Sequence, residues 1–240
     1  MTYTWLLFDI DGTLFDYDRA ESTALRLAFD ESGMPFEPVY LNAYRTINGE
    51  IWQEFERGEI TSQAIKSQRF ARFFDAIGVS FDPLAFGTTY LWCLAQQATL
   101  IDGAEETIRR LHDRYRLFLL TNGLKEVQRE RLARSTLKDY FEGIVISDEV
   151  GVSKPDGRIF DIAFQLMGNP DRAEVLMIGD STTSDMAGAV GYGIDTCWFN
   201  ASGKPAPAGL PIDYEISNLS ELPLLLEKTE LEDERSTTAR

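Results

Sequence analysis

Acidic side chains follow two apolar runs of the chain. Asp9 and Asp11 come after the run 5–8, and Asp180 and Asp185 come after a later run of the same kind. Asp9 and Asp11 are two residues apart, so their side chains point the same way if the strand continues. Two carboxylates so placed repel each other unless a cation or a shared proton joins them. Carboxylate chemistry is therefore the first candidate for this chain.

One lysine and two neutral polar residues complete the candidate set. Thr121 and Asn122 close another apolar run, and Lys154 precedes Pro155, which could open a helix. A few hard oxygen ligands suit Mg²⁺, and a phosphoryl group between Mg²⁺ and Lys154 has its charge neutralised from two sides. One carboxylate can then attack phosphorus, while a second protonates the leaving oxygen and activates water.

Composition excludes several other chemistries. The 240 residues contain 23 basic and 39 acidic side chains, a net charge of −16, with one His and two Cys. A single His cannot build a multi-histidine zinc site. A thiol phosphatase loop needs Arg six residues after Cys, but Cys93 and Cys197 have Thr99 and Gly203 there. The acid excess argues against a nucleic-acid polymer as a partner, because binding its phosphates needs clustered Lys and Arg.

The sequence also predicts where the protein works. No apolar run approaches the ~20 residues that span a bilayer, so we expect no membrane partner. The N-terminus lacks a basic segment, and Asp9 interrupts its apolar run early, which disfavours a secretory signal. Two Cys far apart in the chain indicate free thiols and not a disulfide framework. We therefore expect a cytoplasmic protein.

Short apolar runs alternate with amphipathic segments along most of the chain. The runs lie at 5–8, 117–120, 143–146, 175–178 and 194–199, and helical patterns at 105–114 and 125–134 stand between them. Runs without alternation suit strands that are buried on both faces. Strand, polar loop and helix in repetition predict an α/β fold with a Rossmann-like parallel sheet, and ligands bind such sheets at the carboxyl ends of the strands.

One long segment breaks this rhythm. Residues 16–98 carry helical periodicity throughout and are rich in aromatic residues. We interpret them as an inserted α-helical cap, with residues 1–15 and 99–226 forming the core. Residues 227–240 are charged and poor in apolar side chains, so we expect a flexible tail.

Four short motifs together resemble those of the haloacid dehalogenase-like (HAD) superfamily. They are Asp9-Ile10-Asp11-Gly12-Thr13, Thr121-Asn122, Lys154-Pro155, and Gly179-Asp180 with Asp185. The resemblance covers residues 5 to about 226, and it implies a HAD-like Rossmann core whose helical cap closes over the site. It implies Asp9 as the nucleophile and Asp11 as the general acid and base. It further implies that Thr121 and Lys154 bind the phosphate, helped by backbone groups at Asp11 and Asn122. For the Mg²⁺ ligands it implies Asp9, Asp11, Asp180 and Asp185.

Longer stretches are similar to one branch of this superfamily. Asp11 itself favours phosphatases, because dehalogenases lack the second Asp. The flanks at 13–21, 150–156 and 193–200 look like those of the pyrimidine 5′-nucleotidase subfamily. That resemblance implies a small-molecule partner, a pyrimidine nucleoside monophosphate such as deoxyuridylate, thymidylate or a damaged-base analogue.

Alternatives remain open from the sequence. Two other enzymatic functions fit the same motifs: a small-molecule phosphatase for phosphoglycolate or a sugar phosphate, and a phosphomutase. A binding module without catalysis is a third reading, which the intact acidic residues and Lys154 disfavour. The side chain of Asn122 can serve as a helix cap, and Asp185 can serve as a favourable charge at a helix start. The sequence carries no prediction of oligomeric state.

Overall fold

The computed structural model describes residues 3–238, with two compact units along the chain. The first, here called the core unit, runs to Asp16, includes Leu100–Asn122 and resumes at Ser135. The second, here called the helical unit, consists of Tyr17–Thr99 and Gly123–Arg134. Among the described residues, no helix is long and apolar enough to cross a membrane.

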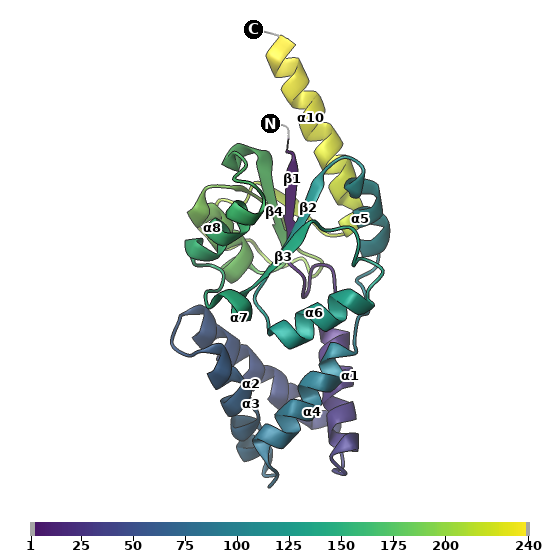
Figure 1. Ribbon diagram of the computed structural model, residues 1–240, viewed down its shortest axis with the longest axis vertical. Coiled ribbons are helices and arrows are strands. Elements are labelled where there is room, and N and C mark those ends of the chain that lie inside the picture. The colour runs from purple at the N-terminus through teal and green to yellow at the C-terminus, as the bar shows by residue number, and fades with distance from the viewer. Residues whose placement is uncertain (1–2, 239–240) are drawn as a thin grey trace. The chain divides into compact units, whose positions relative to one another are not determined.

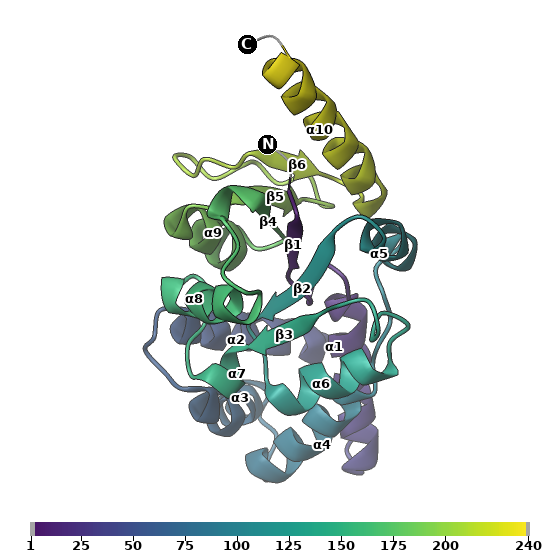
Figure 2. The same cartoon turned by 45° about the horizontal axis from the view of Figure 1, so that its top comes forward.

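A six-stranded parallel sheet forms the centre of the core unit (Figures 1 and 2). The strand order is β3-β2-β1-β4-β5-β6. The strands are β1 (Trp5–Phe8), β2 (Arg116–Thr121), β3 (Gly143–Ile146), β4 (Val175–Gly179), β5 (Asp195–Phe199) and β6 (Tyr214–Ile216). All four residues of β1 are buried, as expected for a strand covered on both faces.

The strand order reverses its direction at β1. The chain runs outward from β1 to β2 and β3 on one side, then continues as β4, β5 and β6 on the other. Phe8 at the end of β1 pairs with both Leu119 and Ile178. The carboxyl ends of β1, β2 and β4 therefore meet at the topological switch point, where α/β sheets bind ligands.

Helices cover both faces of this sheet. Alternate strand residues such as Trp5 and Leu7 share a hydrophobic cluster with Phe160 of α8 (Gly157–Leu166) and Ala189 of α9 (Ala187–Tyr192). Helices α5 (Ala104–His112) and α10 (Leu222–Thr238) lie on the opposite side of the sheet in both views, and the short helix α7 (Ser147–Val150) directly follows β3. The core unit is thus a three-layer α/β sandwich.

The helical unit packs around its own aromatic core. Its helices are α1 (Tyr17–Glu31), α2 (Pro38–Glu56), α3 (Ser62–Ile77), α4 (Pro83–Ala95) and α6 (Lys125–Arg134). Phe86 packs edge to face against both Phe29 and Phe70 at its centre, with ring centroids 5.0 Å apart in each of these two pairs. The aromatic residues at helical spacing in this part of the sequence therefore form the core between the helices.

The observed fold confirms the predicted class, an α/β protein with a parallel Rossmann-like sheet. Three features differ from the sequence prediction. Strand β6 was not predicted, and α6 packs with the helical unit although it lies between two strands of the sheet. The chain from 227 to 238 continues helix α10, where we expected a flexible tail. Residues 239–240 of that predicted tail lie outside the described residues.

Candidate active site

The end of β1 places Asp9 at the middle of the carboxyl edge of the sheet. The backbone N–H of Asp9 donates to the carbonyl of Ile178 at 2.9 Å, which extends the pairing of β1 with β4 by one step. Thr121 ends β2 on the other side of β1 and is fully buried. Asp180 directly follows β4. Residues remote in the sequence therefore converge because parallel strands end at one edge.

Lys154 is the cation at this edge, and its side chain is 1% exposed. Its Nζ donates to Asp9 Oδ1 at 2.6 Å and to the carbonyl of Leu120 at 2.7 Å. Nζ also lies 2.6 Å from Asp185 Oδ1. That contact is a second buried ion pair of the same ammonium group. One buried ammonium group thus faces two buried carboxylates.

The electrostatics of this group follow from burial and crowding. Burial lowers the pKa of Lys154, but the carboxylates of Asp185 and Asp9 outweigh it and raise that pKa above its ordinary value. Burial raises the pKa of Asp9 well above its ordinary value, against the effect of Lys154 and together with that of Asp185 and Asp180. One ammonium therefore does not balance the carboxylates that surround it.

Asp180 is the accessible member of the acidic group. Its side chain is exposed, yet the protein atoms around it and the charge of Asp185 raise its pKa to about 7. Lys154 opposes this shift, and Asp11 adds to it. Asp11, the second Asp of the first motif, is therefore close enough for its charge to act on Asp180.

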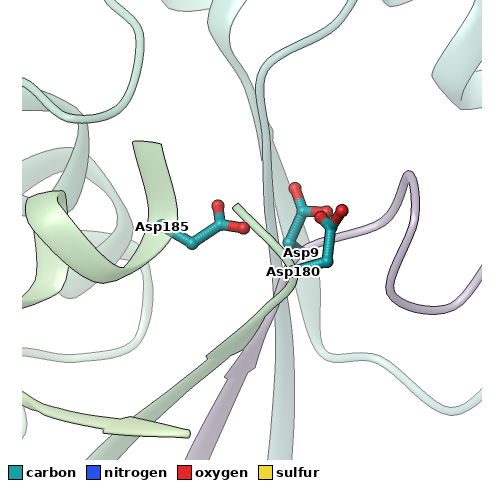
Figure 3. Close-up of side chains that lie close together, drawn as sticks. All are labelled: Asp9, Asp180 and Asp185. Atoms are coloured by element: carbon teal, nitrogen blue, oxygen red, sulfur yellow. The ribbon is translucent and has the colours of Figure 1, made fainter. Parts of the chain in front are cut away.

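Three carboxylates could hold one metal ion. Asp9, Asp180 and Asp185 each offer an oxygen, and these oxygens lie within 4.8 Å of one another. Figure 3 shows Asp9 and Asp180 side by side, with Asp185 directed toward them from its helical turn. Asp185 Oδ1 and Asp9 Oδ1 share the ammonium group of Lys154, so a metal cation would add positive charge that these buried oxygens lack. Hard oxygen donors in this number fit Mg²⁺. The side chain of Asp11 is not in this group, so its predicted role as a metal ligand stays a prediction.

Two glycines leave room for these carboxylates. Gly12 has a φ of 83°, and a Cβ built on it would lie 2.5 Å from Asp180 Oδ2. A Cβ on Gly179 would collide with the carboxylate of Asp185. The Gly in each motif is therefore needed because an acidic side chain occupies the space beside it.

The side chain of Asn122 makes hydrogen bonds with the backbone of Lys154. Its Nδ2 donates to the carbonyl of Lys154, and its Oδ1 accepts from the N–H of Lys154, both at 2.8 Å. The sequence analysis left open that the side chain of Asn122 caps a helix while its backbone binds phosphate. The observed pair of hydrogen bonds fixes the backbone that carries Lys154.

Sequence reasoning missed two residues near this site. Thr13 is fully buried, and its hydroxyl donates to Asp9 Oδ2 at 3.3 Å. Trp198 donates from its indole nitrogen to the carbonyl of Asp180 at 2.9 Å. Thr13 stands in the first motif and Trp198 in the flank 193–200, which was the available signal. Neither contact follows from spacing alone.

The fold and this site define a class of protein: an α/β enzyme whose carboxylates and lysine meet at the switch point of a parallel sheet. A sequence profile of the haloacid dehalogenase-like hydrolases matches residues 3–193. The chain belongs to that family, and it is a hydrolytic enzyme.

Known relatives match nearly the whole chain. It is 35% identical to the pyrimidine 5′-nucleotidase YjjG of Escherichia coli, over 94% of this chain and 99% of that one. It is 34% identical to the pyrimidine 5′-nucleotidase PynA of Streptococcus pneumoniae, over 97% and 98%. The crystal structure of the HAD-hydrolase YfnB of Bacillus subtilis, bound to magnesium, superposes with a TM-score of 0.89 at 34% identity, over 94% of this chain and 99% of that one.

Proposed function

We propose that the protein is a phosphomonoesterase that hydrolyses pyrimidine nucleoside 5′-monophosphates through a phosphorylated Asp9. The observation that carries the proposal is the buried contact between Asp9 and Lys154, which lies beside the acidic group at the switch point. The similarity to YjjG and PynA over nearly the full chain supports the substrate class. The proposal includes a small phosphate ester as the partner, no nucleic-acid polymer, and a cytoplasmic location.

In the first step a carboxylate oxygen of Asp9 attacks phosphorus. The bond from phosphorus to the 5′ oxygen of the nucleoside breaks, and the protonated Asp11 gives that oxygen its proton. Lys154 keeps a positive charge beside the phosphoryl oxygens, because its pKa is raised and not lowered by its surroundings. Thr121 and the backbone of Asn122 donate hydrogen bonds to the same oxygens.

In the second step water removes the phosphoryl group from Asp9. Asp11, now a carboxylate, takes a proton from the water as its oxygen attacks phosphorus. The bond between phosphorus and Asp9 breaks, so that inorganic phosphate leaves and the Asp9 carboxylate and the Asp11 proton are restored.

The proposed metal ligands are Asp9, Asp180 and Asp185, with Asp11 as the fourth residue that the resemblance implies. When bound, Mg²⁺ would neutralise charge on the phosphoryl oxygens and on the carboxylates themselves. Two other residues act on Asp9 without the metal: Lys154 pairs with one of its oxygens, and Thr13 donates a hydrogen bond to the other.

A panel of phosphate esters with released phosphate as the readout tests the proposal. It contains pyrimidine and purine monophosphates, phosphoglycolate and sugar phosphates. We expect the highest kcat/KM on pyrimidine monophosphates. A preference for phosphoglycolate or a sugar phosphate would move the function to a general small-molecule phosphatase, and isomerisation without net phosphate release would identify a mutase.

Asp9→Asn tests the nucleophile. The change keeps the shape of the side chain and removes the attacking carboxylate, so phosphate release should fall to background while the protein stays folded. Asp139→Asn, at an exposed position, is the matched control for the loss of one negative charge. Turnover that survives Asp9→Asn would contradict the mechanism.

A further inference from the structure

Trp198 lies in the segment 193–200 that the sequence analysis singled out, and the proposed mechanism does not use it. The strand pairing sets its position: Trp198 of β5 pairs with Gly179 of β4, so it stands beside the last residue before Asp180. The indole is 2% exposed and belongs to the same hydrophobic cluster as Met177 and Met186. A side chain so enclosed has little freedom to turn.

The indole N–H makes one hydrogen bond, to the carbonyl oxygen of Asp180, at 2.9 Å. That carbonyl belongs to the peptide unit that joins Asp180 to Ser181. The N–H of the same peptide unit donates to Asp185 Oδ2 at 3.0 Å. Because a trans peptide is planar, with its C=O and N–H on opposite sides, fixing the oxygen also fixes the direction of the N–H.

The two hydrogen bonds therefore form one chain, from Trp198 through the peptide unit to Asp185. The Asp185 oxygen that accepts from Ser181 is Oδ2, which leaves Oδ1 directed to Lys154. A donor on the carbonyl also polarises the peptide and strengthens its N–H as a donor. Asp180 itself is held at its main chain while its side chain faces the other carboxylates.

We propose that Trp198 is a positioning residue for the metal site, because its indole N–H orients the Asp180–Ser181 peptide unit and thereby both Asp180 and Asp185. It touches no reacting atom. The proposal rests on the metal site and not on the nucleotide preference, so a different substrate leaves it standing. Partners that orient metal ligands in this way change metal affinity by 10- to 100-fold when they are lost.

The test is Mg²⁺ binding to the protein without substrate, measured by titration calorimetry. Trp198→Phe removes the N–H and should raise the Kd for Mg²⁺ about 10-fold. Trp5→Phe is the matched control, because Trp5 is 3% exposed and lies in the same hydrophobic cluster. Trp5→Phe should lose about as much stability as Trp198→Phe, and its Kd for Mg²⁺ should stay within about twofold of the wild-type value.

A second variant separates the hydrogen bond from the packing. Replacing Trp198 with 3-benzothienylalanine keeps the two fused rings and exchanges the N–H for sulfur, so the core stays filled. It should weaken Mg²⁺ binding to the same extent as Trp198→Phe, with thermal unfolding close to that of the wild type. Three outcomes would each overturn the proposal. They are an unchanged Mg²⁺ affinity in this variant, an equal loss of Mg²⁺ affinity in Trp5→Phe and Trp198→Phe, and a wild-type protein that binds no Mg²⁺.

Discussion

At the scale of single residues, the site depends on which side chains are absent as much as on those present. The carboxylates of Asp180 and Asp185 occupy the volume where Gly12 and Gly179 would carry a Cβ. The acidic residues themselves were predictable, because they stand at fixed distances after apolar runs. The contacts of Asn122 and Trp198 were not, because each joins positions far apart in the sequence that only the folded sheet brings together. The contact of Thr13 with Asp9 is local, but it depends on the path of the loop after β1, which spacing does not give.

Gly12→Ala should disable the enzyme for a steric reason. The new methyl group meets Asp180, a proposed metal ligand, and must displace it; a misplacement of about 1 Å at an active site can cost roughly 100-fold in rate. Gly168→Ala is the matched control, since Gly168 has a similar φ of 88° but nothing within 4 Å of its Cβ. Both variants should lose about 1 kcal/mol of stability to the left-handed backbone, measured by urea unfolding. Gly12→Ala with the kcat of the control would refute this reading.

At the scale of secondary structure, the sequence predicted the strands that are buried and missed the elements that depend on remote partners. Strands β1, β3 and β4 carry continuous apolar runs, which is a local signal. Strand β6 has three residues with one buried, too short to show a pattern. Helix α6 shows helical sequence, but its place in the helical unit rests on contacts such as the hydrogen bond from Arg131 to the carbonyl of Gln97.

The C-terminal helix α10 is held by contacts with residues more than 100 positions away in the sequence. Its charged sequence resembles a tail, yet Glu227 pairs with Arg110 at 2.6 Å, and Glu230 accepts a hydrogen bond from the hydroxyl of Tyr115 at 2.6 Å. Burial and the charge of Glu230 raise the pKa of Tyr115, so the phenol stays protonated as a donor. The glutamates that suggested a solvated segment are the groups that attach it to α5 and to Tyr115, the residue just before β2.

A double-mutant cycle between Tyr115 and Glu230 should show this attachment. Because the acceptor is charged and the pair is partly buried, we expect a coupling free energy of about 1 kcal/mol from thermal or urea unfolding of Tyr115→Phe, Glu230→Ala and the double variant. The exposed pair of Glu106 and Arg109 is the comparison, with a smaller expected coupling. Equal coupling in the two pairs would mean that α10 is not held through Tyr115.

At the scale of the whole molecule, a net charge of −16 opposes an anionic substrate, and the site repeats that imbalance locally. Three carboxylates face one ammonium, which leaves two negative charges when all are ionised. The raised pKa values of Asp9 and Asp180 express the cost of that state. One divalent cation cancels the excess, so metal binding and the stability of the folded chain should be linked.

Mg²⁺ should therefore stabilise the protein as well as activate it. At a free concentration of about 100 times its Kd, a ligand that binds only the folded state adds about 2.7 kcal/mol to the free energy of unfolding. We expect this gain in chemical unfolding with MgCl₂, its absence in NaCl of equal ionic strength, and loss of turnover in excess chelator. Asp139→Asn should keep the gain, whereas Asp185→Asn should lose it, because that change removes the charge of one of the three carboxylates that could hold the ion. The same gain in Asp185→Asn would place the stabilising Mg²⁺ elsewhere, and full turnover in chelator would refute a metal requirement.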